Sequence, residues 1–77
     1  MEHNLKLLTQ FLYESDLNAS DFYSITINKN RIALQGNFDK SIGLHASKYA
    51  DGLLDSDSGY IEFNFPYYGA NINITLT

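Results

Sequence analysis

The sequence contains no cysteine and no tryptophan, and its 77 residues include one proline and two histidines. Without cysteine the chain forms no disulfide, and two histidines offer little for a structural metal site, so neither device that often stabilises short chains is evident. A chain of this length makes one domain at most, which we expect to span residues 1–77. Its stability must come from packing of apolar side chains, or from binding to a partner.

Long apolar runs are also absent. No run approaches the roughly 20 residues that a membrane-spanning helix requires, and Met1-Glu2-His3 lacks the basic start and apolar stretch of a secretory signal. We therefore expect no membrane association and a cytoplasmic location. Yet 44% of the residues are hydrophobic and 14% are aromatic, which is too many for a disordered chain.

Basic residues are scarce. Five lysines and arginines stand against nine aspartates and glutamates, which gives a net charge of −4. Binding to nucleic acid needs clustered basic side chains that contact phosphates. The composition therefore argues against a nucleic-acid partner.

Residues 4–14 carry the pattern of an amphipathic helix. Leu5, Leu8 and Leu12 recur at the helical period, with Leu7 and Phe11 beside them. The opposite face is polar, with Lys6, Gln10 and Glu14. Turn-forming residues at 15–21 then end the helix.

Between residues 22 and 38 the apolar period changes to two, which predicts two strands joined by a short turn. A two-residue turn at Lys29-Asn30 sets Ile27 opposite Ile32 and places both apolar rows on one face. The same turn sets Ile25 opposite Leu34. A three-residue loop would turn one row away from the other, so the pattern favours the two-residue turn.

A second helix is expected over about residues 40–50. Asp39 is a suitable N-cap, and Gly52 is a suitable left-handed stop. Ile42, Ala46 and Tyr49 form its apolar stripe, whereas Gly43 weakens it.

A second pair of strands follows at residues 60–65 and 71–77. A turn at Tyr68-Gly69 sets facing apolar pairs on one side of the sheet: Phe65 with Ile72, Phe63 with Ile74, and Ile61 with Leu76. The predicted fold class is therefore α+β, in the order helix, hairpin, helix, hairpin, with a four-stranded antiparallel sheet and two helices on one of its faces. The order of the strands across the sheet stays open.

Two short motifs suggest chemistry without supporting it. Asp55-Ser56-Asp57-Ser58-Gly59 is acidic like a calcium loop, but alignment on Gly59 places Phe65 where the bidentate glutamate belongs. Ser41 and His45 lie four residues apart on the second helix, but neither a strained turn nor an oxyanion site accompanies them, and a packed His45 is the simpler interpretation. We predict no catalytic, metal or cofactor site, and no enzymatic activity.

The outward rows of the predicted sheet are nearly uncharged. Charged residues are depleted in the cores of protein interfaces, so such a face suits protein binding, although a solvated sheet face rich in threonine and asparagine has the same composition. Residues 63–77 contain no charge at all. If residues 71–77 form a sheet edge, nothing guards it, and pairing with a second copy or another partner is expected.

Tyr67 and Tyr68, at the tip of the second hairpin, offer aromatic contact area and a polar hydroxyl. Tyrosines that cap the end of a small core would look the same in the sequence. The contact residues that we predict lie on the outward rows and this tip: Tyr60, Tyr67, Tyr68, Asn71, Asn73, Thr75 and Thr77.

The chain resembles small orphan proteins of bacteriophages and mobile elements. The resemblance rests on three stretches: Ser24-Ile25-Thr26-Ile27-Asn28, Gly59-Tyr60-Ile61-Glu62-Phe63 and Asn71-Ile72-Asn73-Ile74-Thr75-Leu76-Thr77. Among such phage proteins, small acidic α+β proteins, anti-CRISPR proteins included, commonly bind and block a host defence protein. The resemblance thus implies a non-catalytic inhibitor with a protein partner. A homo-oligomer that assembles through the last strand, and a ligand or enzymatic site built between subunits, are the alternatives.

Overall fold

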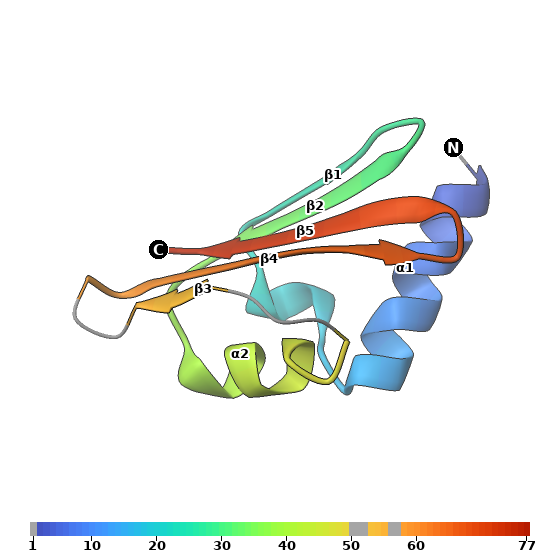
Figure 1. The fold of residues 1–77 in the computed structure, drawn as a ribbon. Coiled ribbons are helices and arrows are strands. Elements are labelled where there is room, and N and C mark those ends of the chain that lie inside the picture. The colour runs from blue at the N-terminus through green and yellow to red at the C-terminus, as the bar shows by residue number, and fades with distance from the viewer. Residues whose placement is uncertain (1, 50–52, 56–57) are drawn as a thin grey trace.

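The computed structural model describes residues 2–49, 53–55 and 58–77 (Figure 1). The chain is α+β, with helices and strands in the following order: α1 (Glu2–Ser15), the 3-10 turn η1 (Ala19–Asp21), β1 (Ser24–Ile27), β2 (Arg31–Gly36), α2 (Lys40–Ala46), β3 (Leu53–Asp55), β4 (Tyr60–Tyr67) and β5 (Ala70–Leu76).

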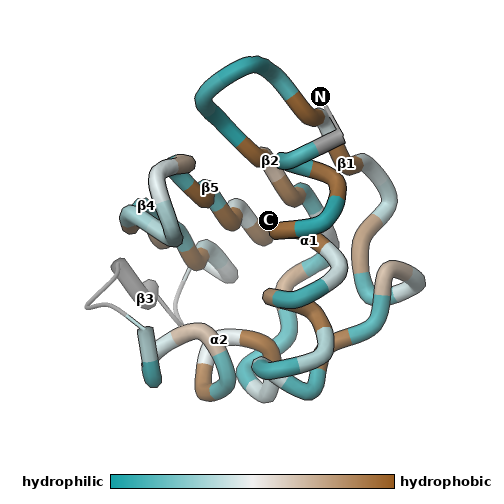
Figure 2. Tube along the Cα trace, turned by 90° about the vertical axis from the view of Figure 1, so that its right-hand side faces the viewer, coloured by the Kyte–Doolittle hydropathy of each residue, from teal (hydrophilic) through white to brown (hydrophobic). Residues whose placement is uncertain are grey.

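The strands form one sheet in the order β1-β2-β5-β4-β3. Both helices lie on the same face of this sheet (Figures 1 and 2), as the sequence predicts. The sequence did not predict the short strand β3, which pairs with β4. The prediction of a purely antiparallel sheet was wrong, because β2 and β5 run parallel. The long connection through α2, β3 and β4 allows this pairing, since a parallel neighbour requires a crossover rather than a hairpin turn.

The registers within the hairpins are those that the apolar pattern predicts. Ile25 faces Leu34 across β1 and β2, and Phe63 faces Ile74 across β4 and β5. Tyr68 and Gly69 both have positive φ, at 49° and 89°. These angles define the two-residue turn whose twist matches that of the flanking strands.

Helix α1 buries a slightly different stripe from the predicted one. Phe11 is fully buried at the centre of that stripe, whereas Leu5 is 54% exposed. At the start of α1 the buried residue is polar, because Asn4 is buried there. Its side-chain amide donates to the carbonyl oxygens of Asn28 and Lys29, at 2.6 and 2.8 Å. These bonds fix the start of α1 to the β1–β2 turn.

Helix α2 is shorter than predicted and ends at Ala46. Its N-cap is Asp39, as expected, and the Asp39 carboxylate accepts hydrogen bonds from both the backbone N–H and the hydroxyl of Ser41. Those bonds lower the pKa of Asp39. The expected stop at Gly52 lies outside the described residues.

Aromatic rings join the helical layer to the sheet. The centroid of the Phe11 ring lies 5.2 Å from that of Tyr49, 5.7 Å from that of Phe65 and 5.5 Å from that of Tyr67. Most of these rings meet at steep angles, the arrangement that aromatic pairs prefer. The cluster connects α1, the segment after α2, and β4.

Two glycines make close approaches that differ in kind. A Cβ atom on Gly36 would lie 2.9 Å from the backbone oxygen of Asp21, whereas a Cβ atom on Gly43 would lie 3.0 Å from the Cδ1 methyl of Ile61. Backbone cannot easily shift, but the end of an isoleucine side chain can. Close approach to η1 therefore requires glycine at position 36.

We predict that Gly36→Ala lowers the free energy of unfolding by about 1–3 kcal/mol, measured by urea denaturation. Gly43→Ala is the matched control, because its helix-propensity gain of about 1 kcal/mol offsets the crowding of Ile61. Equal effects of the two substitutions would contradict this difference between backbone and side-chain crowding.

Candidate functional site

The last strand lies in the middle of the sheet. Strand β5 pairs with β2 on one side and β4 on the other, so the hypothesis that residues 71–77 form an exposed edge is wrong. Its lack of charge has another cause: a central strand needs no charged side chains to repel a neighbouring chain. Strand addition to β5 has no free edge on which to act.

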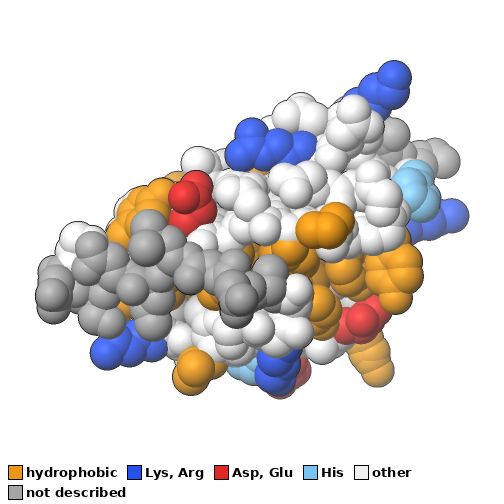
Figure 3. Space-filling model, in the orientation of Figure 1, with side chains coloured by type: hydrophobic (Ala, Val, Ile, Leu, Met, Phe, Trp, Pro, Cys, Tyr) orange, Lys and Arg blue, Asp and Glu red, His pale blue; other side chains and the backbone are white. Residues whose placement is uncertain are grey.

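The face of the sheet opposite the helices carries the predicted polar rows. Across its middle, the register aligns Thr26, Ala33, Asn73 and Asn64 from four adjacent strands. In Figure 3 the surface over β1, β2 and β5 is mostly uncharged, with basic and acidic groups set apart from one another. We call the face of the sheet opposite the helices the open face.

Side chains on the open face hydrogen-bond to one another. The amide of Asn73 donates to Asn64 Oδ1 at 3.0 Å and to the carbonyl oxygen of Phe63 at 3.4 Å, and Thr75 donates to Asn73 Oδ1 at 3.2 Å. The amide of Asn71 also reaches Asn64 Oδ1, at 3.5 Å. This ladder of bonds holds the amides in fixed orientations and leaves Asn73 only 5% exposed.

Most of the predicted contact residues share the open face, but they differ in exposure. Asn71, Thr75 and Tyr60 are half-buried there, Thr77 is exposed, and Asn73 is buried within the ladder. The list missed Asn64 and Gln35, both exposed on the same face. A signal for Asn64 was present, because the turn at Tyr68-Gly69 sets it opposite Asn73.

The two tyrosines of the second hairpin have separate environments. Tyr67 is buried among the core aromatics, and its hydroxyl donates to Glu14 Oε1 at 2.9 Å. Tyr68 is 68% exposed, with its ring against that of Tyr67 at 4.8 Å between centroids. Of these two tyrosines, only Tyr68 therefore presents its ring to a partner.

Ser41 and His45 have separate environments. The Ser41 hydroxyl donates to Asp39 Oδ1 at 2.7 Å, as part of the N-cap of α2. The Nδ1 atom of His45 is buried without a hydrogen-bond partner, and His45 is half-buried as a residue. The acceptor of the Ser41 hydroxyl is therefore the capping carboxylate of Asp39 and not the imidazole of His45.

No cluster of metal-ligating side chains occurs within the described parts of the chain. The aspartates of the acidic motif, Asp55 and Asp57, lie outside the residues whose side chains the structure describes. Neither helix, as far as it is described, has the length and apolar character to cross a membrane.

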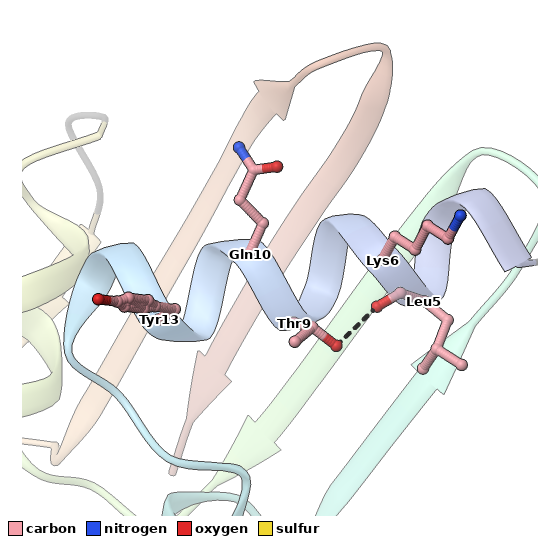
Figure 4. Close-up of a pocket in the computed structure, with 5 residues that line it drawn as sticks. All are labelled: Leu5, Lys6, Thr9, Gln10 and Tyr13. Atoms are coloured by element: carbon pink, nitrogen blue, oxygen red, sulfur yellow. Dashed lines mark hydrogen bonds between the residues drawn. The ribbon is translucent and has the colours of Figure 1, made fainter.

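A shallow hollow runs along the outer surface of α1 (Figure 4). Its lining residues all belong to this one helix: Leu5, Lys6, Thr9, Gln10 and Tyr13. A ligand pocket normally encloses most of its ligand between several elements. One helix surface lacks such walls, so the hollow is a weak candidate for a small-molecule site.

Comparison with known proteins gives no guide to function: no protein-family model, no curated protein and no solved structure matches the chain. The surfaces of the structure itself must therefore carry the functional argument.

The buried hydroxyl of Tyr67 makes stability sensitive to high pH. Burial, and then the hydrogen bond to Glu14, raise the pKa of Tyr67 from 10.0 to about 12. The unfolded phenol ionises first as the pH rises, so the stabilisation present below pH 10 is lost between pH 10 and pH 12. We predict a tyrosine that ionises near pH 12 in an absorbance titration of the folded protein.

Tyr67→Phe should remove the transition near pH 12 and reduce the loss of unfolding free energy between pH 10 and 12, measured by urea denaturation. Tyr68→Phe, at an exposed position, is the matched control and should leave both observations unchanged. If the transition near pH 12 disappeared in Tyr68→Phe and not in Tyr67→Phe, the assignment of the raised pKa to Tyr67 would be wrong.

Proposed function

We propose that the chain is a non-catalytic protein-interaction module that docks through the open face of its sheet. The use that we infer is the one its resemblance to small phage proteins implies, which is to bind and block a host protein. The observation that carries the proposal is the ladder of neutral amides and hydroxyls across the middle of this face.

A neutral polar face is easier to desolvate than a charged one. On strands β1, β2, β5 and β4, the charged residues of the open face are Arg31 and Glu62, and they lie far apart: Arg31 is opposite Asn71 at one end, and Glu62 is opposite Thr75 towards the other. Because charged groups lose much more hydration than amides on burial, a centre without charges lowers the cost of complex formation.

The ladder also reduces the entropic cost of binding. Asn64 and Asn73 are held by hydrogen bonds before a partner arrives, so they lose little rotamer freedom on contact. Asn73 itself is buried, so the exposed Asn64 is the member of this pair that a partner can contact. We infer a partner with a flat, neutral surface rich in amides and hydroxyls.

Asn73 is a poor site at which to test this proposal. Its amide is buried and bonded to Asn64 and Phe63, so replacement by lysine would break the ladder and weaken the fold. Gln35 on β2 is a better site, because it is exposed and lies opposite Thr75 on the adjacent strand β5.

Gln35→Lys should reduce affinity for the partner at least about tenfold, since binding would bury an unpaired charge. The partner is first identified by capture from the native host followed by mass spectrometry, and the affinity is then measured by calorimetry with the purified partner. Thr9→Lys, on the exposed surface of α1, adds the same charge elsewhere and should leave affinity unchanged. Loss of affinity with Thr9→Lys and not with Gln35→Lys would contradict the proposal and would place the contact on the helical side of the molecule.

A further inference from the structure

Strand β1 is an outer edge of the sheet. It pairs only with β2 in the described parts of the chain. Asn28 N–H donates to the carbonyl oxygen of Arg31, which directs the backbone groups of Thr26 and Asn28 towards β2, and Tyr23 N–H donates to the carbonyl oxygen of Gln35 at the start of the strand. Backbone groups alternate along a strand, so the N–H and C=O groups of Ile25 and Ile27 point away from the sheet.

This edge lacks the usual protection against pairing. Strand β1 reads Ser24-Ile25-Thr26-Ile27, without charge or proline. Strand β4 shows the contrast: Pro66 faces Asn71, whose N–H points to Asn30 on the β2 side, so the missing donor of Pro66 is on the side of β4 away from β5. The side of the sheet that carries β4 is guarded, and the β1 side is not.

Apolar side chains line the helix side of the β1 edge. Ile25 and Ile27 are only half-buried, although Ile32 and Leu34 facing them on β2 are fully buried. Figure 4 shows Leu5 on the side of α1 towards the β1–β2 hairpin, and Leu5 is 54% exposed. An added strand would cover these side chains while it satisfied the backbone groups.

We propose that β1 pairs with β1 of a second copy, antiparallel about a two-fold axis at Thr26. In this register Ile25 of each copy faces Ile27 of the other, and each such pair exchanges two backbone hydrogen bonds. The isoleucines meet on the helix side and the two Thr26 side chains meet on the open side. The two apolar edges then form one continuous layer.

The charges at the two ends of β1 favour this orientation. Asp21 precedes the strand and Lys29 follows it, with no charged residue between them. Antiparallel pairing brings the acidic end of one copy to the basic end of the other, twice, whereas parallel pairing would align like charges. This complementarity makes a second copy the fitting occupant of the edge.

The inference is independent of the proposed function, because it concerns the edge of the sheet rather than its open face. Pairing through β1 leaves Gln35, Thr75 and Asn64 accessible and sets the two open faces side by side. A partner could then be contacted by one copy or by both.

The test uses charge at the two-fold axis. Thr26 faces its own counterpart in a closely spaced pair, so Thr26→Lys and Thr26→Glu should each place two like charges opposite one another. In sedimentation velocity we expect the wild-type chain to be a dimer, with twice its mass of 8.7 kDa, and each variant to be a monomer. Circular dichroism should show that both variants remain folded. An equimolar mixture of the two variants should restore the dimer.

Gln35→Lys is the control, since it adds charge to β2 instead of β1, and it should remain dimeric. A monomeric wild type, a dimer that persists in either Thr26 variant, or a mixture that stays monomeric would overturn the proposal. These measurements need no partner, so their failure is distinct from failure of the open-face proposal, which is measured by partner affinity.

Discussion

Strand β5 is hydrogen-bonded along both sides, in parallel to β2 and in antiparallel to β4, and every other layer of the structure depends on this position. Its residues Ile72, Ile74 and Leu76 are fully buried and face the helices. Its other face carries Asn71, Asn73 and Thr75. One strand thus supplies the centre of the apolar core and the centre of the polar ladder. Because side chains alternate along a strand, neither surface can shift its register without the other.

The two-sided pairing also explains how a short chain without disulfides builds a core. A central strand buries its apolar row completely, and its backbone groups are satisfied by neighbours on both sides. The ring of Phe11 then brings α1 and the segment after α2 onto the sheet. Stability in such a fold is shared among the long-range contacts of a few large side chains, so positions such as Gly36, where elements approach closely, tolerate little added volume.

Local features of this fold could be predicted from the sequence, and long-range ones could not. The registers of both hairpins follow from apolar alternation and turn length, because these act between residues close in the chain. The parallel pairing of β2 with β5 has no such local signature, since it joins segments separated by a helix and two strands. The same limit applied to α1: periodicity located the helix, but tertiary contacts decided that Asn4 is buried and Leu5 is exposed.

The candidate site shows a related ambiguity. Absence of charge in a strand has two physical causes, burial at the centre of a sheet and a free edge that pairs with another chain. The sequence of β5 fits both, and the structure places it at the centre. Strand β1 (Ser24–Ile27) has the same uncharged character at an edge of the sheet, so composition alone does not distinguish a central strand from an edge strand. The open face was predicted more successfully, because the side on which a residue lies follows from alternation alone and does not depend on strand order.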